Sequence, residues 1–260
     1  MPLPNTRKEN FSEILHGVEI VDPYRWLEGE NVEVKEWAEQ QNLQTRGILD
    51  ALLNREQIKT RLKELYNVEQ VYLPVPRGEY YFFRYRKPNE NYGCVYVQKG
   101  LDGEKRLLID PHQFSEDQKA TLSNWSPSLD GKLFLYGVSQ ASNDRDEIRI
   151  MDVETGKDLK DRIPDDIYPD IDSWSVDGKG FWYTRRDPKA PKGEEKYHRR
   201  VYFHTIGNDY KDDTLFFGQD IKKEDFPSCK QSLDGRYVLA SVSIVSEKER
   251  RSEVYLYDMQ

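Results

Sequence analysis

Val95-Tyr96-Val97 is the stretch that decides the fold, because an equivalent strand motif returns at one fixed interval along the chain. Each further copy begins 53 residues after the one before it, at Ile148-Arg149-Ile150, Val201-Tyr202-Phe203 and Val254-Tyr255-Leu256. A turn with glycine lies upstream of every copy, at Arg77-Gly78, Asp130-Gly131, Asp177-Gly178 and Asp234-Gly235. A constant period of about 50 residues built from short strands is typical of a β-propeller.

Each repeat also carries the other strands that a propeller blade needs. A short alternating segment follows each turn and would form a hairpin with the strand before it, at residues 80–85, 133–138, 180–184 and 237–242. A fourth strand follows three of the motifs, at residues 106–109, 158–163 and 214–218. Four antiparallel strands per repeat make one blade. A helical solenoid would lack the strands, a leucine-rich repeat has a shorter period, and a sandwich would not keep one interval. We therefore predict a mainly β fold, a partial β-propeller of about four blades.

The last of these blades is expected to be incomplete, because the fourth repeat ends at Gln260 after its third strand. Such a blade would expose an apolar face and an unpaired strand edge, both of which favour aggregation. We therefore interpret the chain as the N-terminal portion of a longer protein, with the truncated propeller over residues 69–260.

Residues 1–68 differ from the repeats and are expected to form an α-helical N-terminal arm. After a polar lead, residues 32–53 combine strong helix formers with apolar residues near helical spacing. Asn54 is placed to cap a second helix over residues 55–66, and Gln57 would complete a loose capping box.

Composition narrows the classes of partner. The formal net charge is −8, whereas a nucleic-acid-binding surface would be basic. The short basic runs lie near predicted strand ends, so we interpret them as solvated. No run of about 18 apolar residues is present, and the polar residues 1–10 show no secretory signal. We expect a cytoplasmic protein with neither a nucleic acid nor a membrane as partner.

The sequence carries no motif for catalysis or metal binding. A nucleophile elbow would read Gly-x-Ser-x-Gly, and the nearest stretch, around Ser139, lacks the second glycine. Cys94 and Cys229 are too few for a zinc site or a disulfide framework and are expected to be small buried residues. The four histidines have no ligand spacing. We expect no catalytic residue, no metal site and no cofactor.

One heptapeptide carries the interpretation further. Residues 22–28, Asp-Pro-Tyr-Arg-Trp-Leu-Glu, are followed by Trp37 and Gln41-Asn42. This arrangement resembles the N-terminal signature of the prolyl oligopeptidase family of serine peptidases. Segments in the repeats resemble the same family in the same order, at residues 125–132, 173–183, 201–207 and 233–239. The resemblance covers nearly all 260 residues.

That resemblance implies a function for a complete protein. In the family, the propeller covers the active site of a C-terminal α/β-hydrolase domain and admits short peptides while excluding folded proteins. The Ser-Asp-His triad belongs to the hydrolase domain. This chain would then be the N-terminal portion of a serine endopeptidase that cleaves short peptides after proline, and it would be inactive alone. The alternative is a propeller fragment that acts as a binding module without catalysis.

The resemblance also suggests a role for the heptapeptide. Burial of each large apolar side chain against the hydrolase domain would contribute about 2 kcal/mol of stability. The alternative is that these side chains pack onto the arm's own helices. The residues expected to dock are Asp22, Pro23, Tyr24, Arg25, Trp26 and Leu27.

The pocket-facing residue is less clearly defined. Family members carry an aromatic side chain from the propeller toward the substrate pocket, and Tyr168 is the nearest aromatic residue here. No phenylalanine aligns with that position, so cleavage after basic residues stays open as a second specificity.

Overall fold

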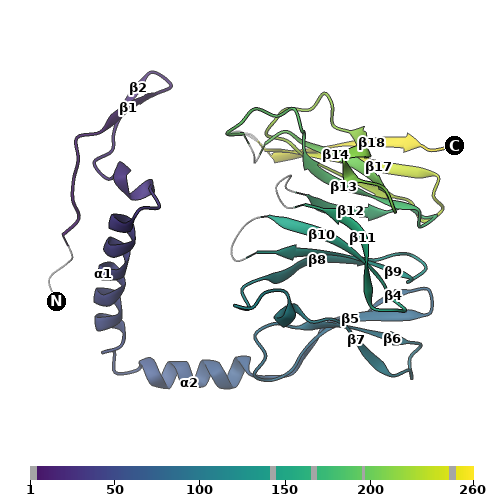
Figure 1. The fold of residues 1–260 in the computed structure, drawn as a ribbon, viewed down its shortest axis with the longest axis horizontal. Coiled ribbons are helices and arrows are strands. Elements are labelled where there is room, and N and C mark those ends of the chain that lie inside the picture. The colour runs from purple at the N-terminus through teal and green to yellow at the C-terminus, as the bar shows by residue number, and fades with distance from the viewer. Residues whose placement is uncertain (1–4, 141–144, 165–168, 195–196, 246–249) are drawn as a thin grey trace. The chain divides into compact units, whose positions relative to one another are not determined.

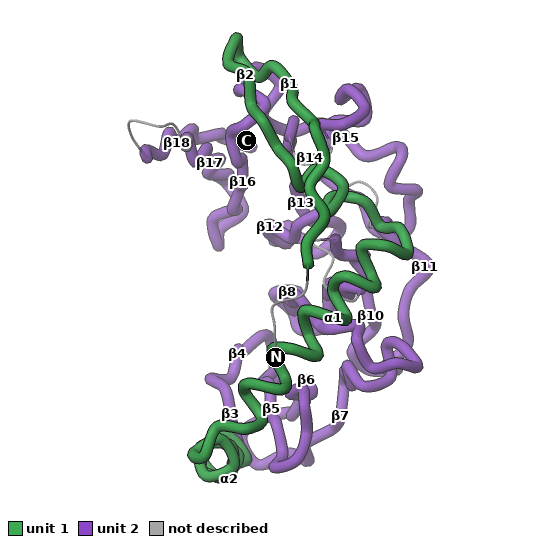
Figure 2. The backbone as a smooth tube through the Cα atoms, turned by 90° about the vertical axis from the view of Figure 1, so that its left-hand side faces the viewer, with its two compact units in different colours: residues 1–68 green, residues 69–260 purple. Residues whose placement is uncertain are grey.

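The computed structural model describes residues 5–140, 145–164, 169–194, 197–245 and 250–260 (Figure 1). They fall into two compact units, residues 1–68 and residues 69–260, which are drawn in separate colours in Figure 2. No helix among the described residues is long and apolar enough to cross a membrane.

Unit 1 begins with a hairpin that the sequence analysis took for a polar lead. Strands β1 (Ser12–Leu15) and β2 (Val18–Val21) pair antiparallel around a turn in which Gly17 has a φ of 81°. The short helix η1 (Arg25–Glu28) and the helices α1 (Val32–Leu49) and α2 (Arg55–Tyr66) follow.

The two helices differ in how they begin. The Asn31 side chain caps α1 by accepting a hydrogen bond from the backbone N–H of Val34 at 3.0 Å. Helix α2 covers the predicted residues, but the predicted Asn54 cap was wrong. The side chain of Asn54 makes no capping hydrogen bond, and its backbone is already helical at φ −94° and ψ 0°. Helix α1 also ends at Leu49, four residues earlier than predicted.

The described part of unit 2 is built from antiparallel sheets, so the prediction of a mainly β fold is confirmed. The first sheet contains β3 (Gln70–Val71), β4 (Val75–Arg77), β5 (Tyr80–Arg86), β6 (Cys94–Lys99) and β7 (Lys105–Ile109). The second contains β8 (Thr121–Pro127), β9 (Leu133–Ser139), β10 (Asp146–Asp152) and β11 (Lys157–Ile163). The third contains β12 (Asp170–Trp174), β13 (Gly180–Arg186), β14 (Arg199–Thr205) and β15 (Thr214–Phe217). The fourth contains β16 (Phe226–Gln231), β17 (Tyr237–Val245) and β18 (Arg250–Asp258).

The recurring motifs occupy equivalent strands of these four sheets. They lie in β6, β10, β14 and β18, each of which pairs with the strand that follows the glycine turn. The sheets lie one above another in chain order (Figure 1). A 53-residue step along the sequence is therefore one step from sheet to sheet.

The apolar core lies between neighbouring sheets, because alternate residues of a strand face opposite sides. In β9, Phe134 and Tyr136 pack in the cluster shared with the first sheet, whereas Leu135 between them packs in the cluster shared with the third. A third cluster joins Trp182 of the third sheet to Val238 of the fourth. Each inner sheet is thus buried on both faces, as a stacked repeat requires.

The glycine turns bring neighbouring sheets close together. Gly131 has a φ of 74°, and a Cβ atom there would lie 2.6 Å from the carbonyl oxygen of Arg77 in the adjacent turn. A Cβ atom at Gly78 would lie 2.3 Å from the carbonyl oxygen of Asp130. These two positions need glycine for space as well as for backbone conformation.

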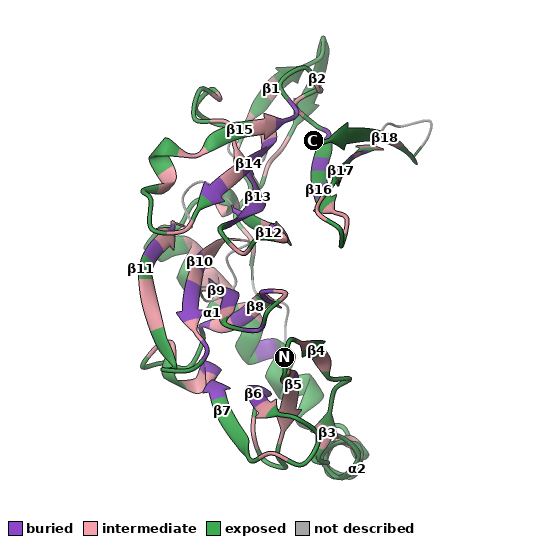
Figure 3. Ribbon diagram, turned by 90° about the vertical axis from the view of Figure 1, so that its right-hand side faces the viewer, coloured by how far each residue is buried: buried purple, intermediate pink, exposed green. Residues whose placement is uncertain are grey.

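The outermost described strand is different. Strand β18 is exposed along nearly its whole length, including Val254 and Leu256, whereas the strands β9 and β13 of the inner sheets are largely buried (Figure 3).

Candidate functional site

The first strands of successive sheets lie next to one another and line a pocket together. Strand β12 contacts both β8 and β16. The side-chain amide of Asn124 on β8 donates a hydrogen bond to Asp170 on β12 at 3.1 Å. A pocket next to these strands is lined by side chains from all three of them, including Ser126, Ser173 and Lys230.

Two carboxyl groups on β12 are perturbed by this setting. Burial raises the pKa of Asp172 to about 7; the Asp170 charge adds to this shift, and a hydrogen bond from Thr184 opposes it. That hydrogen bond, from Thr184 Oγ1 to Asp172 Oδ2, measures 2.8 Å. Burial also raises the pKa of Asp170, against the favourable charge of Arg199. Near neutral pH, Asp172 can therefore either donate or accept a hydrogen bond.

The predicted pocket-facing residue, Tyr168, lies outside the described residues. It precedes the first residue of β12, Asp170, by two positions. The sequence analysis did not single out the polar groups of β12, Asp170 and Asp172.

The predicted docking segment has a defined structure within unit 1. The Asp22 carboxylate accepts a hydrogen bond from the backbone N–H of Tyr24 at 3.0 Å, which forms the turn after β2. The Arg25 guanidinium pairs with Asp22 at 3.3 Å, with Glu28 at 3.1 Å and with Glu13 of the hairpin.

The tryptophan of this segment packs inside its own unit. The Trp26 and Trp37 rings make an edge-to-face contact with centroids 6.4 Å apart. Trp26 Nε1 donates to the carbonyl oxygen of Arg7 at 2.9 Å, and the Arg7 guanidinium lies 4.7 Å from the Trp26 ring centroid. Tyr24 stays 39% exposed. The local packing alternative therefore accounts for Trp26, and the docking role of the segment stays a prediction.

Unit 1 exposes apolar side chains along its helices. Helix α2 has no buried residue, although Ile58, Leu62 and Leu65 share one stripe. A groove at the α1–α2 junction is lined by Leu52, Ile58 and Leu62 together with neighbouring residues. An isolated helix pair gains little stability from such an uncovered stripe.

A buried ionic cluster links the second and third sheets. His204 on β14 is fully buried, and its ring nitrogens contact two buried carboxylates, Asp213 at 2.8 Å and Asp161 on β11 at 3.1 Å. Burial lowers the pKa of His204, but hydrogen bonds to both carboxylates outweigh it and raise the pKa overall. With an acceptor at each nitrogen, the ring is held as the imidazolium.

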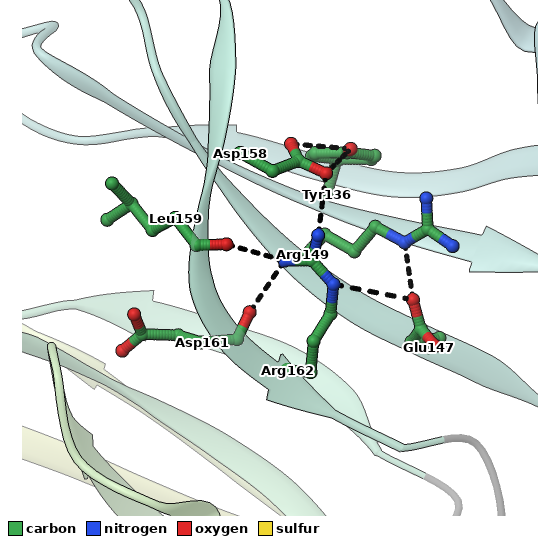
Figure 4. A network of polar contacts seen from close by, with 7 residues as sticks. All are labelled: Tyr136, Glu147, Arg149, Asp158, Leu159, Asp161 and Arg162. Carbon is green, nitrogen blue, oxygen red and sulfur yellow. Dashed lines mark hydrogen bonds and ion pairs between the residues drawn. The ribbon is translucent and has the colours of Figure 1, made fainter.

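Asp161 is itself held in place by a neighbouring arginine. Arg162 donates to the backbone carbonyls of Leu159 at 3.0 Å and of Asp161 at 2.8 Å, and to the Asp158 carboxylate at 2.9 Å (Figure 4). The network fixes β11 so that the Asp161 side chain reaches the next sheet. It is structural in character, since every charge in it is occupied by a partner.

No hydrolytic dyad is assembled in the part of the chain that the structure describes. None of the four histidines there has a serine or cysteine side chain as a hydrogen-bond partner: His204 contacts aspartates, His198 contacts Glu194 and His112 contacts Asp110. General-base activation of a nucleophile requires such a contact.

One group of side chains has the donors for a metal ion. Cys94, Asp110 and His112 each offer a ligand atom, and these atoms all lie within 4.8 Å of one another. The sequence predicted no metal site, because these residues match no ligand spacing. Only the pairing of β6 with β7, in which Val95 faces Ile109, brings Cys94 beside Asp110.

The chain matches one family model over nearly its whole length. The model describes the prolyl oligopeptidase N-terminal β-propeller domain and matches residues 4–260. The prolyl endopeptidase of Elizabethkingia miricola is 30% identical over 262 residues, which cover 99% of this chain and 36% of the relative. The prolyl endopeptidase of Elizabethkingia meningoseptica has the same identity and coverage. The chain thus spans just over a third of the length of these curated relatives.

Solved structures give the same picture. One solved structure comes from a study of two prolyl endopeptidases and of inter-domain dynamics in their catalysis and specificity. It matches with a TM-score of 0.85 and 29% sequence identity, and the match covers 99% of this chain and 38% of that chain. Prolyl oligopeptidase B from Galerina marginata, bound to a 35mer hydrolysis and macrocyclization substrate, matches with a TM-score of 0.78 and 20% identity over 99% of this chain and 40% of its own. The second match supports the fold alone.

Proposed function

The chain belongs to the prolyl oligopeptidase family, and from that premise we propose that it is the N-terminal, substrate-gating portion of a serine oligopeptidase. One observation carries the proposal. Residues 4–260 match the family's N-terminal propeller model, and relatives called prolyl endopeptidase align with 99% of this chain through only 36% of their own length.

In this proposal the chemistry belongs to residues beyond Gln260. An α/β-hydrolase domain would supply a Ser-Asp-His triad, in which serine attacks the peptide carbonyl and histidine carries the proton to the leaving amine. The absence of a Gly-x-Ser-x-Gly elbow from the sequence supports this division. The substrates are short peptides cleaved after proline, with cleavage after basic residues as the second specificity.

The four sheets would be the first four blades of the propeller, with the fourth completed by later residues. The neighbouring strands β8, β12 and β16 would then border its central passage. In this proposal the passage admits a short extended peptide and excludes a folded protein by size. Tyr168 is proposed to face this passage or the adjoining substrate pocket.

The helical arm is proposed to dock on the hydrolase domain. Its support is the exposed apolar stripe of α2, with Ile58 57% and Leu62 48% exposed, for which a covering surface would be stabilising. Tyr24 and Leu27 of the heptapeptide would extend this contact, while Trp26 orients the segment through Trp37.

A peptidase assay tests the proposal with two proteins, the 260-residue chain and the product of the native reading frame. Chromogenic peptides with proline or arginine before the scissile bond serve as substrates. We expect the native product to cleave the proline peptide, with inhibition by a serine-directed reagent, and the 260-residue chain to be inactive. A native product of 260 residues that melts cooperatively and cleaves neither peptide would instead favour the binding module.

A further inference from the structure

We propose that Cys94, Asp110 and His112 form a zinc-binding site at one end of the first sheet. The site is separate from the first strands of the sheets, where the proposed gate lies. It rests on the mutual geometry of three donors of different chemistry and does not depend on the peptidase proposal.

The spacing of the donor atoms suits a tetrahedral ion. Asp110 Oδ1 lies 3.6 Å from Cys94 Sγ and 2.8 Å from His112 Nδ1. With a Zn–S bond of about 2.3 Å and Zn–N and Zn–O bonds of about 2.0–2.1 Å, tetrahedral angles give S···O and N···O separations of about 3.5 and 3.3 Å. The first is already met, and the second needs His112 to move by about half an ångström.

The surroundings hold the ligands in place. The backbone N–H of His112 donates to Asp110 Oδ1 at 3.0 Å, and Gln113 Nε2 donates to Asp110 Oδ2 at 3.1 Å. The Tyr92 ring lies against the imidazole with centroids 5.6 Å apart. Partners of this kind orient ligands and tune metal affinity.

The ligand set favours zinc over magnesium or calcium. Thiolate and imidazole are preferred by zinc, whereas magnesium and calcium take oxygen ligands. The Cys94 side chain is buried, but those of Asp110 and His112 are each 23% exposed, so the ion can enter and water can complete its coordination.

Binding exchanges one proton for the ion. The Cys94 S–H bond breaks, its electron pair forms the Zn–S bond, and the proton leaves to solvent; the imidazole proton is then carried on Nε2, so that Nδ1 can bind. The charged groups near the thiol are Asp110, Glu90 and Lys87.

Cobalt titration of the purified protein tests the site. We expect a near-ultraviolet thiolate-to-cobalt charge-transfer band with visible bands of tetrahedral intensity, all displaced by one equivalent of zinc. Cys94→Ser should abolish the charge-transfer band. Cys229→Ser, which changes a buried cysteine in the fourth sheet, is the matched control and should leave it intact.

A second variant keeps the test decisive if Cys94→Ser fails to fold. Gln113 is exposed, and Gln113→Ala should weaken zinc binding 10- to 100-fold in competition with a chromophoric chelator, with an unchanged circular dichroism spectrum. A cobalt spectrum without the thiolate band, or equal zinc affinity in the wild type and Gln113→Ala, would overturn the proposal.

Discussion

Replacing Asp172 by asparagine is expected to stabilise the protein at alkaline pH. An unfolded aspartate ionises near pH 3.9, whereas burial raises the pKa of Asp172 to about 7 in the folded chain. The unfolded state therefore releases its proton first. Stability falls as the pH rises from about 4 to 7 and stays lower above that range.

The size of the effect follows from this difference. About three pKa units at 1.36 kcal/mol each give about 4 kcal/mol at pH 8. The Asp172 residue is only half-buried, so solvent recovers part of the cost, and we expect a gain of about 2–4 kcal/mol. Asparagine keeps the acceptor for Thr184 and carries no charge.

Urea denaturation at pH 8 and at pH 4.5, followed by circular dichroism, measures the effect. Asp172→Asn should raise the midpoint at pH 8 and raise it much less at pH 4.5, where ionisation of the unfolded wild-type carboxyl costs at most about 1 kcal/mol. Asp102→Asn, at an exposed loop position, is the matched control and should be neutral at both pH values. A gain below 1 kcal/mol at pH 8, or an equal gain at both pH values, would refute the reasoning.

Three further predictions concern packing and the buried ionic cluster. His204→Asn should cost about 3 kcal/mol at pH 6, because it leaves two buried carboxylates without their cation. Because the folded-state pKa of His204 is raised, its contribution to stability is complete below about pH 6.5 and is lost as the pH rises through the folded value. A cost of His204→Asn that grows with pH would contradict the assignment. Gly131→Ala should lower the free energy of unfolding by at least 2 kcal/mol in urea denaturation. Gly178→Ala is the control and should cost about 1 kcal/mol, because its φ of 69° is similar but nothing lies close to it. Equal costs would show that the close approach at Gly131 is unimportant. Trp26→Phe removes the hydrogen bond that the indole N–H donates, which is worth about 1 kcal/mol. Tryptic cleavage within residues 5–68 should then become about fivefold faster. An unchanged rate would argue against that bond.

The strands of the repeats could be predicted because their signal is local and periodic. Alternation and a glycine turn recur at each step, so β9 and β13 begin at the residues expected from the pattern, Leu133 and Gly180. The β1–β2 hairpin was missed because it occurs once, and its turn at His16-Gly17 has no counterpart in the repeats. A single hairpin offers no period that would reveal it.

The side-chain clusters could not be predicted because they depend on pairing between distant segments. His204 meets Asp161 across a separation of 43 residues, through the stacking of two sheets. Cys94 meets Asp110 through the register of β6 with β7. In the same way, Asn54 looked like a cap by residue type, but the turn after α1 had already set its backbone to the helical conformation.

Labelling with a fluorophosphonate tests the central claim most directly, because such reagents modify the activated serine of a serine hydrolase. The protein made from the native reading frame and the 260-residue chain would be treated in parallel, and the modified residue would be located by mass spectrometry. The account predicts no label on the 260-residue chain and a single labelled serine after position 260 in the native product. A labelled serine within residues 1–260 would contradict the account.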